Sequence, residues 1–440
     1  MNICDTISPM TACDFLVLAY ILIGWGLSVS NGMYDVKAYV LMLSALLALL
    51  IGTALSHGQG KTKNILPSRS ILFLGVLSFC FLNVSALSPG LYFQSMSFER
   101  SWWILNVAVL LTLPVLYTPV RWMERMRPWI VLGFVVAALG FRAWLPLASP
   151  EPNIDVFSMS QQSSRHLLAG RNPYVARIRD VYEGQGQLGY VMKHYTYPPA
   201  SLYPQAIAYA LVHDVRSAMI LAEALFLFVL WWIARKRWPS ALLELVLLLF
   251  LFQPRGLFVL EQSWTEPLLL GSLALFVFLW SRSKIVASLL AFGYFLSIKQ
   301  YTIFFALPLL ILERRWAKLS VVALAITATL LPFMLWHGRS LWEQGILFQL
   351  TPPFRDDSLS LSSVVLPWVG EIGKGWSAMI ATVASAVMSF LFRKEHLQGF
   401  LQSIAVTAAC MFILGSWSFA NYYYFLSGSI LLSLVCHKRQ

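Results

Sequence analysis

The 440-residue chain carries little charge and lacks the short patterns of several soluble enzyme classes. Only 12% of its residues are charged, whereas a soluble domain carries about 25%. The P-loop, HExxH and GxSxG patterns are absent, and no loop is long enough for a soluble catalytic domain acting on nucleotide sugars. The sequence therefore does not favour a soluble nucleotide-dependent or hydrolytic enzyme.

Spacings typical of metal sites and of duplicated folds are also missing. The five cysteines form no CxxC pair, and four of them lie in or beside apolar segments, where a small buried side chain is the ordinary role. Asp356 and Asp357 are adjacent acids without further spaced ligands, which is a weak signal for a divalent cation. No internal repeat is visible, which counts against transporters built from duplicated halves. We expect no cofactor and no metal ion.

Apolar sequence runs through the chain from end to end. Hydrophobic residues make up 58% of it, and the mean hydropathy is +0.68. We therefore predict an all-α polytopic membrane protein with about 13–14 transmembrane or re-entrant helices and a large non-cytoplasmic loop. The predicted spans are roughly 14–30, 38–56, 70–88, 101–120, 128–147, 217–234, 240–253, 265–280, 285–297, 301–313, 319–336, 376–392, 399–416 and 421–436.

Basic residues predict the orientation of these spans. The net charge of +12 is spread over short connections rather than gathered on one nucleic-acid-binding surface. Placing these connections in the cytoplasm places both chain ends there too, as in a multi-pass protein of a bacterial inner or plasma membrane. The basic clusters are Lys61-Lys63-Arg69, Arg121-Arg125-Arg127, Arg235-Lys236-Arg237, Arg282-Lys284, Arg314-Arg315-Lys318, Arg393-Lys394 and His437-Lys438-Arg439.

The chain is expected to have three parts. Residues 1–147 form an N-terminal transmembrane scaffold of about five helices. Residues 148–216 form an outer polar loop with amphipathic or re-entrant helices, and residues 217–440 form a C-terminal bundle that completes the site. Within the loop, residues 199–213 are long enough for a short helix. We favour a re-entrant or tilted helix there, and the alternative is a span that leaves one basic cluster on the outer side.

The outer loop holds the candidate general base, Asp155. It opens a weakly amphipathic stretch, 155–168, that is expected to lie on the membrane surface. An ionised carboxylate at this place can take the proton of an attacking hydroxyl. The alternative is that Asp155 caps a helix N-terminus, where Asp is favoured.

Lys299 and Gln300 stand between two short apolar segments. A Lys at such a break is costly inside a membrane and needs an anionic partner, for which a phosphate is a good candidate. The alternative is that the Lys side chain reaches to the interface. Arg255, Glu261 and Glu266 flank the start of the predicted span 265–280, where they either pair with one another or, for Arg255, bind a lipid phosphate.

The order of motifs resembles a known family. Asp155 is followed by LLAGRNPY at 167–174, by YTYPP at 195–199, and later by Lys299. This order resembles the polyprenyl-phosphate-sugar-dependent GT-C glycosyltransferases, in particular their bacterial mannosyltransferase-like branch. The resemblance covers about 155–315 and, more loosely, the C-terminal spans. It differs from the family in that about five spans precede the loop and only one acid stands at the motif.

The resemblance implies a GT-C-like fold and an inverting transfer. A hexose (mannose-like) or pentose would move from a polyprenyl-phosphate donor to a hydroxyl of a lipid-linked or cell-envelope glycan, on the non-cytoplasmic face. It implies that Asp155 is the general base and that Lys299, with Arg255 and Arg171, binds the donor phosphate. The remaining candidate substrate-binding residues are Asn172, Tyr174, His194, Tyr197, Glu261, Gln300 and Asn421. The partners would be this donor, the acceptor and membrane lipids, with no nucleic acid.

Three other interpretations remain. A polymerase or ligase of lipid-linked glycans also has large outer loops, but the Asp–NPY–YPP order is not its signature. A transporter or flippase of lipid-linked substrates would place charges along a path reaching both faces, whereas the predicted polar residues gather outside. A purely structural membrane subunit does not explain the polar loop. Near the C-terminus, the aromatic residues at 419–424 either form an interfacial belt or stack on a sugar.

Overall fold

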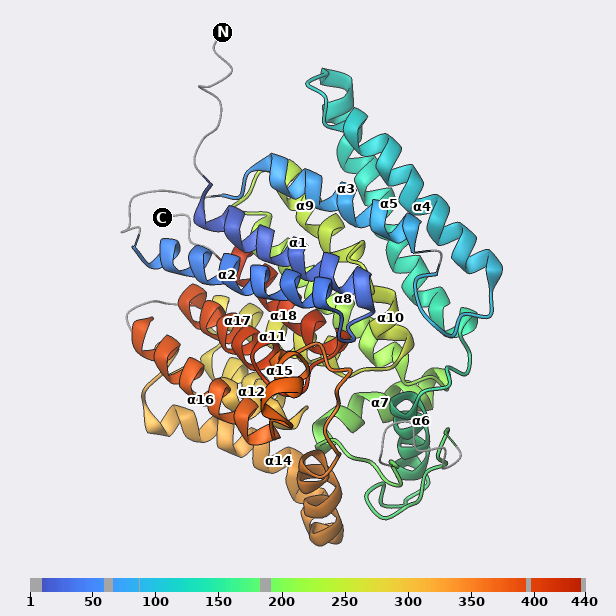
Figure 1. Cartoon of the computed structure of the whole chain (residues 1–440), viewed down its shortest axis with the longest axis vertical. Coiled ribbons are helices and arrows are strands. Elements are labelled where there is room, and N and C mark those ends of the chain that lie inside the picture. The colour runs from blue at the N-terminus through green and yellow to red at the C-terminus, as the bar shows by residue number, and fades with distance from the viewer. Residues whose placement is uncertain (1–9, 59–65, 87, 183–190, 393–396, 437–440) are drawn as a thin grey trace.

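The computed structural model describes residues 10–58, 66–86, 88–182, 191–392 and 397–436 (Figure 1). The fold of these residues is helical, and the one isolated β-bridge that they contain joins Met33 to Ser358. Some of the basic residues that predict the membrane orientation lie outside the described residues. These are Lys61, Lys63, Arg393, Lys394, His437, Lys438 and Arg439.

The helices follow the predicted spans closely. They are α1 (Ala12–Ser30), α2 (Val36–Gly58), α3 (Arg69–Ser85), α4 (Met96–Leu116), α5 (Arg121–Ala148), α6 (Asp155–Leu168), α7 (Pro199–Val212), α8 (Arg216–Ala234), α9 (Ser240–Leu251), α10 (Gly256–Glu261), α11 (Glu266–Ser281), α12 (Ile285–Leu296), the 3-10 helix η2 (Gln300–Phe305), α13 (Leu309–Leu312), α14 (Trp316–Ser340), the π-helix η3 (Leu341–Ile346), the 3-10 helix η4 (Leu347–Leu350), α15 (Leu361–Val369), α16 (Lys374–Leu391), α17 (Leu397–Ile413) and α18 (Ala420–Val435).

Six segments of the described chain are long and apolar enough to cross a membrane. They are α1, α2, α5, α8, the segment Trp316–Leu350 that begins with α14, and α16. Shorter apolar helices such as α3, α9, α11 and α12 accompany them. The chain is therefore an all-α protein with the helices of a multi-pass membrane protein.

The predicted span 301–313 is not one α-helix. Lys299 is extended (φ −147°), and the chain continues as η2 and then as the short α13. Thr302 Oγ1 lies within hydrogen-bond distance of the carbonyls of Leu296 (2.8 Å) and Lys299 (2.6 Å), so its hydroxyl serves backbone groups at the break. Such a break inside a membrane protein needs this local compensation.

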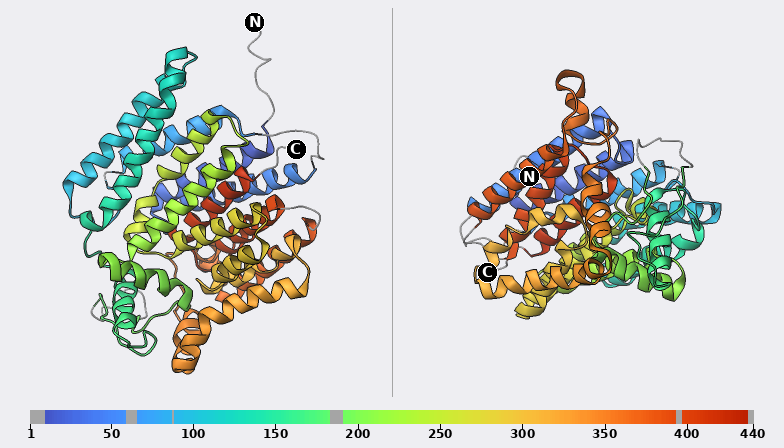
Figure 2. Two further views of the ribbon diagram at one scale, coloured as in Figure 1. Left: turned by 180° about the vertical axis from the view of Figure 1, so that it is seen from behind. Right: turned by 90° about the horizontal axis from the view of Figure 1, so that it is seen from below.

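The helix at 199–213 lies beside α6 at one end of the bundle, as Figures 1 and 2 show. Pro199 begins α7, as favoured at the first helical position. At the other end of α7, the Gln161 side chain of α6 donates to the carbonyl of His213 (2.7 Å) and accepts from the N–H of Val215 (3.2 Å). α7 therefore packs along α6 and does not run the length of the bundle.

Each connection between consecutive helices lies at one of the two ends of the bundle. The N-terminal end of α1 and the C-terminal end of α18 lie at the same end of the helix bundle (Figure 1). The connections α4–α5, α8–α9, α11–α12 and α13–α14, which carry the described basic clusters, fall at that end too. The connections α1–α2, α3–α4, α5–α8, α9–α11 and α17–α18 lie at the opposite end (Figure 1), and Lys299 at the break lines a cavity together with residues of these connections.

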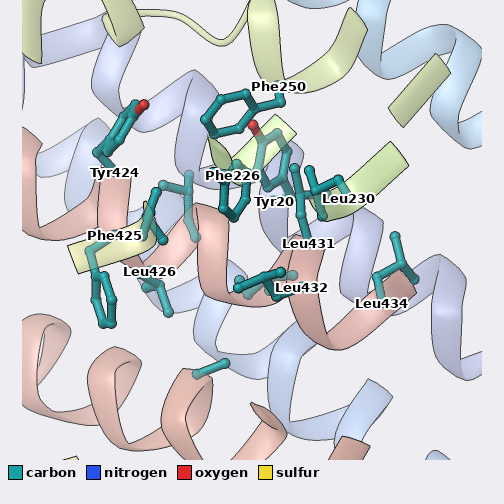
Figure 3. Packing of buried hydrophobic residues seen from close by; sticks show 14 of the residues in the cluster. Tyr20, Phe226, Leu230, Phe250, Tyr424, Phe425, Leu426, Leu431, Leu432 and Leu434 are labelled. Atoms are coloured by element: carbon teal, nitrogen blue, oxygen red, sulfur yellow. The ribbon is translucent and has the colours of Figure 1, made fainter. Parts of the chain in front are cut away.

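A tightly packed core holds α1, α8, α9 and α18 together, as Figure 3 shows. A polar network that the sequence did not reveal lies within it. Arg142 of α5 is fully buried and donates from Nε to Glu223 Oε2 of α8 (2.7 Å) and from Nη2 to the Leu251 carbonyl (3.1 Å). The Tyr424 hydroxyl donates to Glu223 Oε1 (2.9 Å). The network thus ties the scaffold helix α5 to the C-terminal bundle.

Breaking this network should destabilise the whole chain. Arg142→Ala leaves Glu223 buried without its cation, so we expect the free energy of unfolding to fall by about 3–5 kcal/mol. Arg125→Ala, an exposed Arg near the start of the same helix, should change it by less than about 0.5 kcal/mol. Denaturant titration in mixed micelles measures both. Equal stability of the two variants would contradict the structural role given to Arg142.

Candidate active site

Asp155 is the first residue of α6, and Ile154 is the N-cap residue. The interpretation of Asp155 as a helix cap is therefore wrong. The N–H of Val156 donates to Asp155 Oδ1 (2.7 Å), and the backbone N–H of Asp155 points to the Tyr182 hydroxyl (3.5 Å). A carboxylate in the first turn is also favoured by the partial positive charge of the helix N-terminus.

The carboxyl group of Asp155 is tuned by opposing effects. Burial raises its pKa to about 6, while the Val156 N–H and the nearby Arg355 guanidinium act in the lowering direction. Arg355 itself is held by a two-point contact with Asp357, at 2.6 Å from Nε and 2.5 Å from Nη2. Asp155 is thus a stronger base than an ordinary Asp and is still ionised at neutral pH.

Lys299 has a carboxylate partner within the protein. Its Nζ lies 2.5 Å from Glu266 Oε1 at the start of α11, and both side chains are almost fully buried. Asn421 Nδ2 (2.9 Å) and the Tyr301 hydroxyl (3.3 Å) donate to the same oxygen. The side chain of Lys299 therefore does not reach out to the interface, and Glu266 does not pair with Arg255.

Aromatic rings surround the ammonium group of Lys299. Its Nζ lies 4.7 Å from the ring centre of Tyr422, 5.3 Å from that of Tyr197 and 5.5 Å from that of Tyr301. Rings at these distances favour a cation. In the aromatic run near the C-terminus, Tyr423 and Tyr424 are buried in the bundle, whereas Phe419 and Tyr422 are partly exposed and line a cavity.

Asp155 and Lys299 line one cavity of about 300 Å³. Its walls come from the connections at the end of the bundle opposite the chain termini. Its lining combines aromatic side chains with a few polar groups, as in small-molecule sites generally. The polar and ionic residues among the lining are Asn31, Asp155, Gln262, Lys299, Gln349, Arg355 and Asn421, and the aromatic ones are Tyr92, Tyr182, Tyr197, Phe258, Trp264, Phe348, Trp417, Phe419 and Tyr422.

Several predicted site residues form hydrogen bonds that support the wall of this cavity. The N–H of Tyr174 donates to Asn172 Oδ1 (2.9 Å), and the Tyr174 hydroxyl donates to the Tyr197 carbonyl (2.7 Å). Gln300 Nε2 donates to the carbonyls of Thr196 (2.8 Å) and Gly345 (2.7 Å). These contacts join the Asn-Pro-Tyr corner to the wall that carries Tyr197, and they join that wall to the break next to Lys299.

His194 and Glu261 hold other parts of the backbone. His194 Nδ1 lies 3.1 Å from the Ala176 carbonyl. Glu261 accepts the N–H groups of Leu91 (2.7 Å) and Tyr92 (2.9 Å), both of which line the cavity. Glu261 therefore fixes one cavity wall and is not itself part of the lining.

The structure does not bring Arg255 and Arg171 to Lys299. Arg255 has a left-handed backbone (φ 64°), and its Nη1 donates to the Ser88 carbonyl (3.1 Å) in a separate small pocket. Arg171 is exposed and lines a different groove, beside the end of α14. The family resemblance implied that both bind the donor phosphate together with Lys299, but the turns that carry them direct the two side chains elsewhere.

Gln262 lines the cavity but was not singled out by the sequence. Gln262 is 2% exposed, and its Nε2 has no hydrogen-bond partner among the described residues. It can donate to an oxygen of a molecule in the cavity. Arg355 acts on Asp155 from a loop 200 positions further along the chain, a proximity that no local pattern encodes.

The described residues contain no group of three or more His, Cys, Asp or Glu side chains that could hold a metal ion. The chain matches no protein-family model, and searches of curated proteins and of solved structures return no match.

Proposed function

We propose that this chain is a membrane glycosyltransferase. It would move a hexose, mannose-like, or a pentose from a polyprenyl-phosphate donor to a hydroxyl of a lipid-linked or cell-envelope glycan. The observation that carries this proposal is that Asp155 and Lys299 line the same cavity although they lie far apart in the sequence. The resemblance of the Asp155, NPY and YPP motifs to the GT-C enzymes supports it.

In this mechanism Asp155 removes the proton of the acceptor hydroxyl. The hydroxyl oxygen attacks the anomeric carbon as the bond to the phosphate oxygen breaks, and the configuration inverts because there is one displacement. Polyprenyl phosphate leaves as an anion and needs no general acid. Gln262 and Asn421, whose side-chain amides line the cavity, are the residues that we expect to orient the sugar.

Lys299 offsets the charge on the leaving phosphate. An ammonium group has three N–H donors, and Glu266 takes one of them. The other donors are available to the phosphate oxygens at the cavity wall. Glu266, Asn421 and the aromatic rings fix Nζ in place, so the cation is positioned before the donor binds, as efficient charge stabilisation requires.

The position of the cavity supports a site on the non-cytoplasmic face. The described basic clusters lie at one end of the bundle and the cavity at the other, so the positive-inside rule predicts that the cavity faces outward. The lining residues come from connections at this end, from helix ends and short helices beside them, and from the break at Lys299, which favours an enzyme over a transporter with a path to both faces.

Labelling of single cysteines tests this orientation. In a chain whose five cysteines are replaced, Cys introduced at the exposed positions Pro150 and Asp356 should react with a membrane-impermeant maleimide from the outer side. Cys introduced at Arg315 should react only after the membrane is opened. The reverse pattern would overturn the orientation and with it the outward-facing site.

Activity should depend on pH through Asp155. Because burial raises the pKa of this carboxyl to about 6, the base is protonated and inactive below that pH. We expect kcat/KM to rise about tenfold per pH unit below pH 6 and to level off above it. Steady-state rates from pH 4.5 to 8 measure this, and a flat profile across pH 6 would contradict the assignment.

The function itself is tested with defined donors. The purified full chain is incubated with labelled polyprenyl-phosphate hexoses and pentoses together with membrane glycolipid acceptors. We expect transfer from at least one donor, with inversion at the anomeric carbon. Retention of configuration would exclude the single displacement, and the absence of transfer and hydrolysis with every donor would contradict the proposal.

A further inference from the structure

A second groove lies outside the cavity, between the Asn-Pro-Tyr corner and the C-terminal part of α14. It has a volume of about 340 Å³. It is lined by Arg171, Asn172, Val175, Ala176, Trp336 and His337. None of these residues lines the cavity of Asp155 and Lys299, so the groove needs an explanation of its own.

Three residues with hydrogen-bond donors line this groove. Arg171 is exposed, and no carboxylate among the described residues forms an ion pair with it. Asn172 is 8% exposed, and its Nδ2 has no partner in the described chain, whereas its Oδ1 is already taken by the Tyr174 N–H. His337 Nδ1 accepts the N–H of Ser340 (3.3 Å), so in the neutral ring the proton is on Nε2, which makes Nε2 a donor.

The chemistry of these groups is that of an anion site. A guanidinium, an unpartnered buried amide and an imidazole N–H offer donors and positive charge, and no acid side chain lines the groove. Arg in particular matches phosphate oxygens with two parallel hydrogen bonds. An unpartnered buried donor also costs free energy until something binds to it, so Asn172 favours occupancy.

The helix α14, whose C-terminal part forms one side of the groove, also has an exposed apolar face. Leu324, Leu331 and Leu335 are 63%, 43% and 79% exposed and recur at helical spacing on one face. Trp336, 45% exposed, stands at the edge of the groove. α14 is a helix of membrane-spanning length, so these side chains face the hydrocarbon while the donors lie at its boundary.

We propose that this groove binds the headgroup of a phosphate-bearing membrane lipid, whose chain lies along the exposed Leu face of α14. Arg171 and His337 contact the phosphate oxygens, and Asn172 Nδ2 donates to one of them. The juxtaposition of a donor-rich groove with an apolar helix face selects an amphiphile over a soluble anion. The proposal does not depend on glycosyl transfer, because its residues are separate from the cavity.

Protection of a cysteine in the groove tests the proposal. Val175, which is 47% exposed, is replaced by Cys in an otherwise cysteine-free full chain in detergent micelles. Its maleimide labelling is followed while farnesyl phosphate is titrated in. We expect farnesyl phosphate to slow labelling, and equal concentrations of farnesol or inorganic phosphate to have little effect. Equal protection by farnesol would exclude phosphate recognition, and protection by inorganic phosphate alone would identify a soluble-anion site; either result overturns the proposal.

Further variants of the Val175→Cys chain test whether Arg171 contacts the phosphate. Arg171→Ala should raise the farnesyl phosphate concentration for half-protection by about tenfold or more. Arg177→Ala, an exposed Arg of the same loop outside the groove, should leave it unchanged and serves as the matched control. Arg171 is exposed, so its loss should not unfold the chain. Unchanged protection in Arg171→Ala would overturn the proposal, whatever the result of the transfer assay.

Discussion

Asp155→Asn is expected to lower the rate of glycosyl transfer by about 10²–10⁴-fold, the range for loss of a general base. The substitution keeps the size of the side chain and the acceptor for the Val156 N–H, so the start of α6 should persist. The amide cannot take a proton from the acceptor hydroxyl. Single-turnover transfer from a saturating donor concentration measures the loss.

The control for this prediction is Asp356→Asn. Asp356 is an exposed acid of the outer loops that does not line the cavity, so its variant should transfer at the wild-type rate. Donor binding by Asp155→Asn should also be close to wild-type, because Asp155 acts on the acceptor. Normal transfer by a well-folded Asp155→Asn variant would remove Asp155 from the mechanism.

Lys299→Ala is expected to impair both stability and donor use. Glu266 would remain buried without its cation, and breaking a buried pair in this way costs about 3–5 kcal/mol. The same change removes the charge that faces the phosphate. Transfer should become undetectable, but loss of the fold alone would give the same result.

A double variant separates the two effects. Lys299→Met with Glu266→Gln removes both charges and keeps an amide oxygen that can accept from Asn421 and Tyr301. We expect thermal unfolding close to that of the wild type, because a buried pair replaced as a unit costs little. Donor affinity should stay reduced by about tenfold or more. Wild-type donor affinity in the double variant would show that Lys299 does not bind the phosphate.

The helices could be predicted from the sequence because hydrophobic length and local end signals determine them. The predicted stretch 155–168 coincides with α6, and Pro199 marks the start of α7. The segment 301–313 is helical as predicted, but it consists of the 3-10 helix η2 and the short α13 rather than one α-helix. Composition reports how apolar a segment is but not which type of helix its backbone forms.

Pairings between distant residues could not be predicted. The need of Lys299 for an anion was predicted, but the structure supplies Glu266 from α11, and only packing of α11 against α12 and α18 brings them together. Likewise, Arg171 and Arg255 carry the right charge for a phosphate, yet their turns direct them into other pockets. Arg142 was overlooked because a single Arg near the end of an apolar run gives no local signal of its partner Glu223.

Lys299 differs from the cation that the sequence predicted, because its anionic partner is Glu266 of the same chain rather than a phosphate alone. Its ammonium group is paired with Glu266 and lies near three aromatic rings. A donor phosphate would therefore join an existing polar cluster rather than create the first ion pair of Lys299. This arrangement limits the cost of burying the Lys in a membrane bundle while keeping it available to the substrate.

The most direct test of the central proposal is release of polyprenyl phosphate from a sugar-loaded donor by the purified full chain. Wild-type protein and Asp155→Asn are compared at equal concentration in the same lipid, with the acceptor lipid present. We predict that the wild type releases polyprenyl phosphate in step with glycosylation of the acceptor and that the variant releases it at least about 10²-fold more slowly. Equal rates in the two proteins, or no release by the wild type with any hexose or pentose donor, would contradict it.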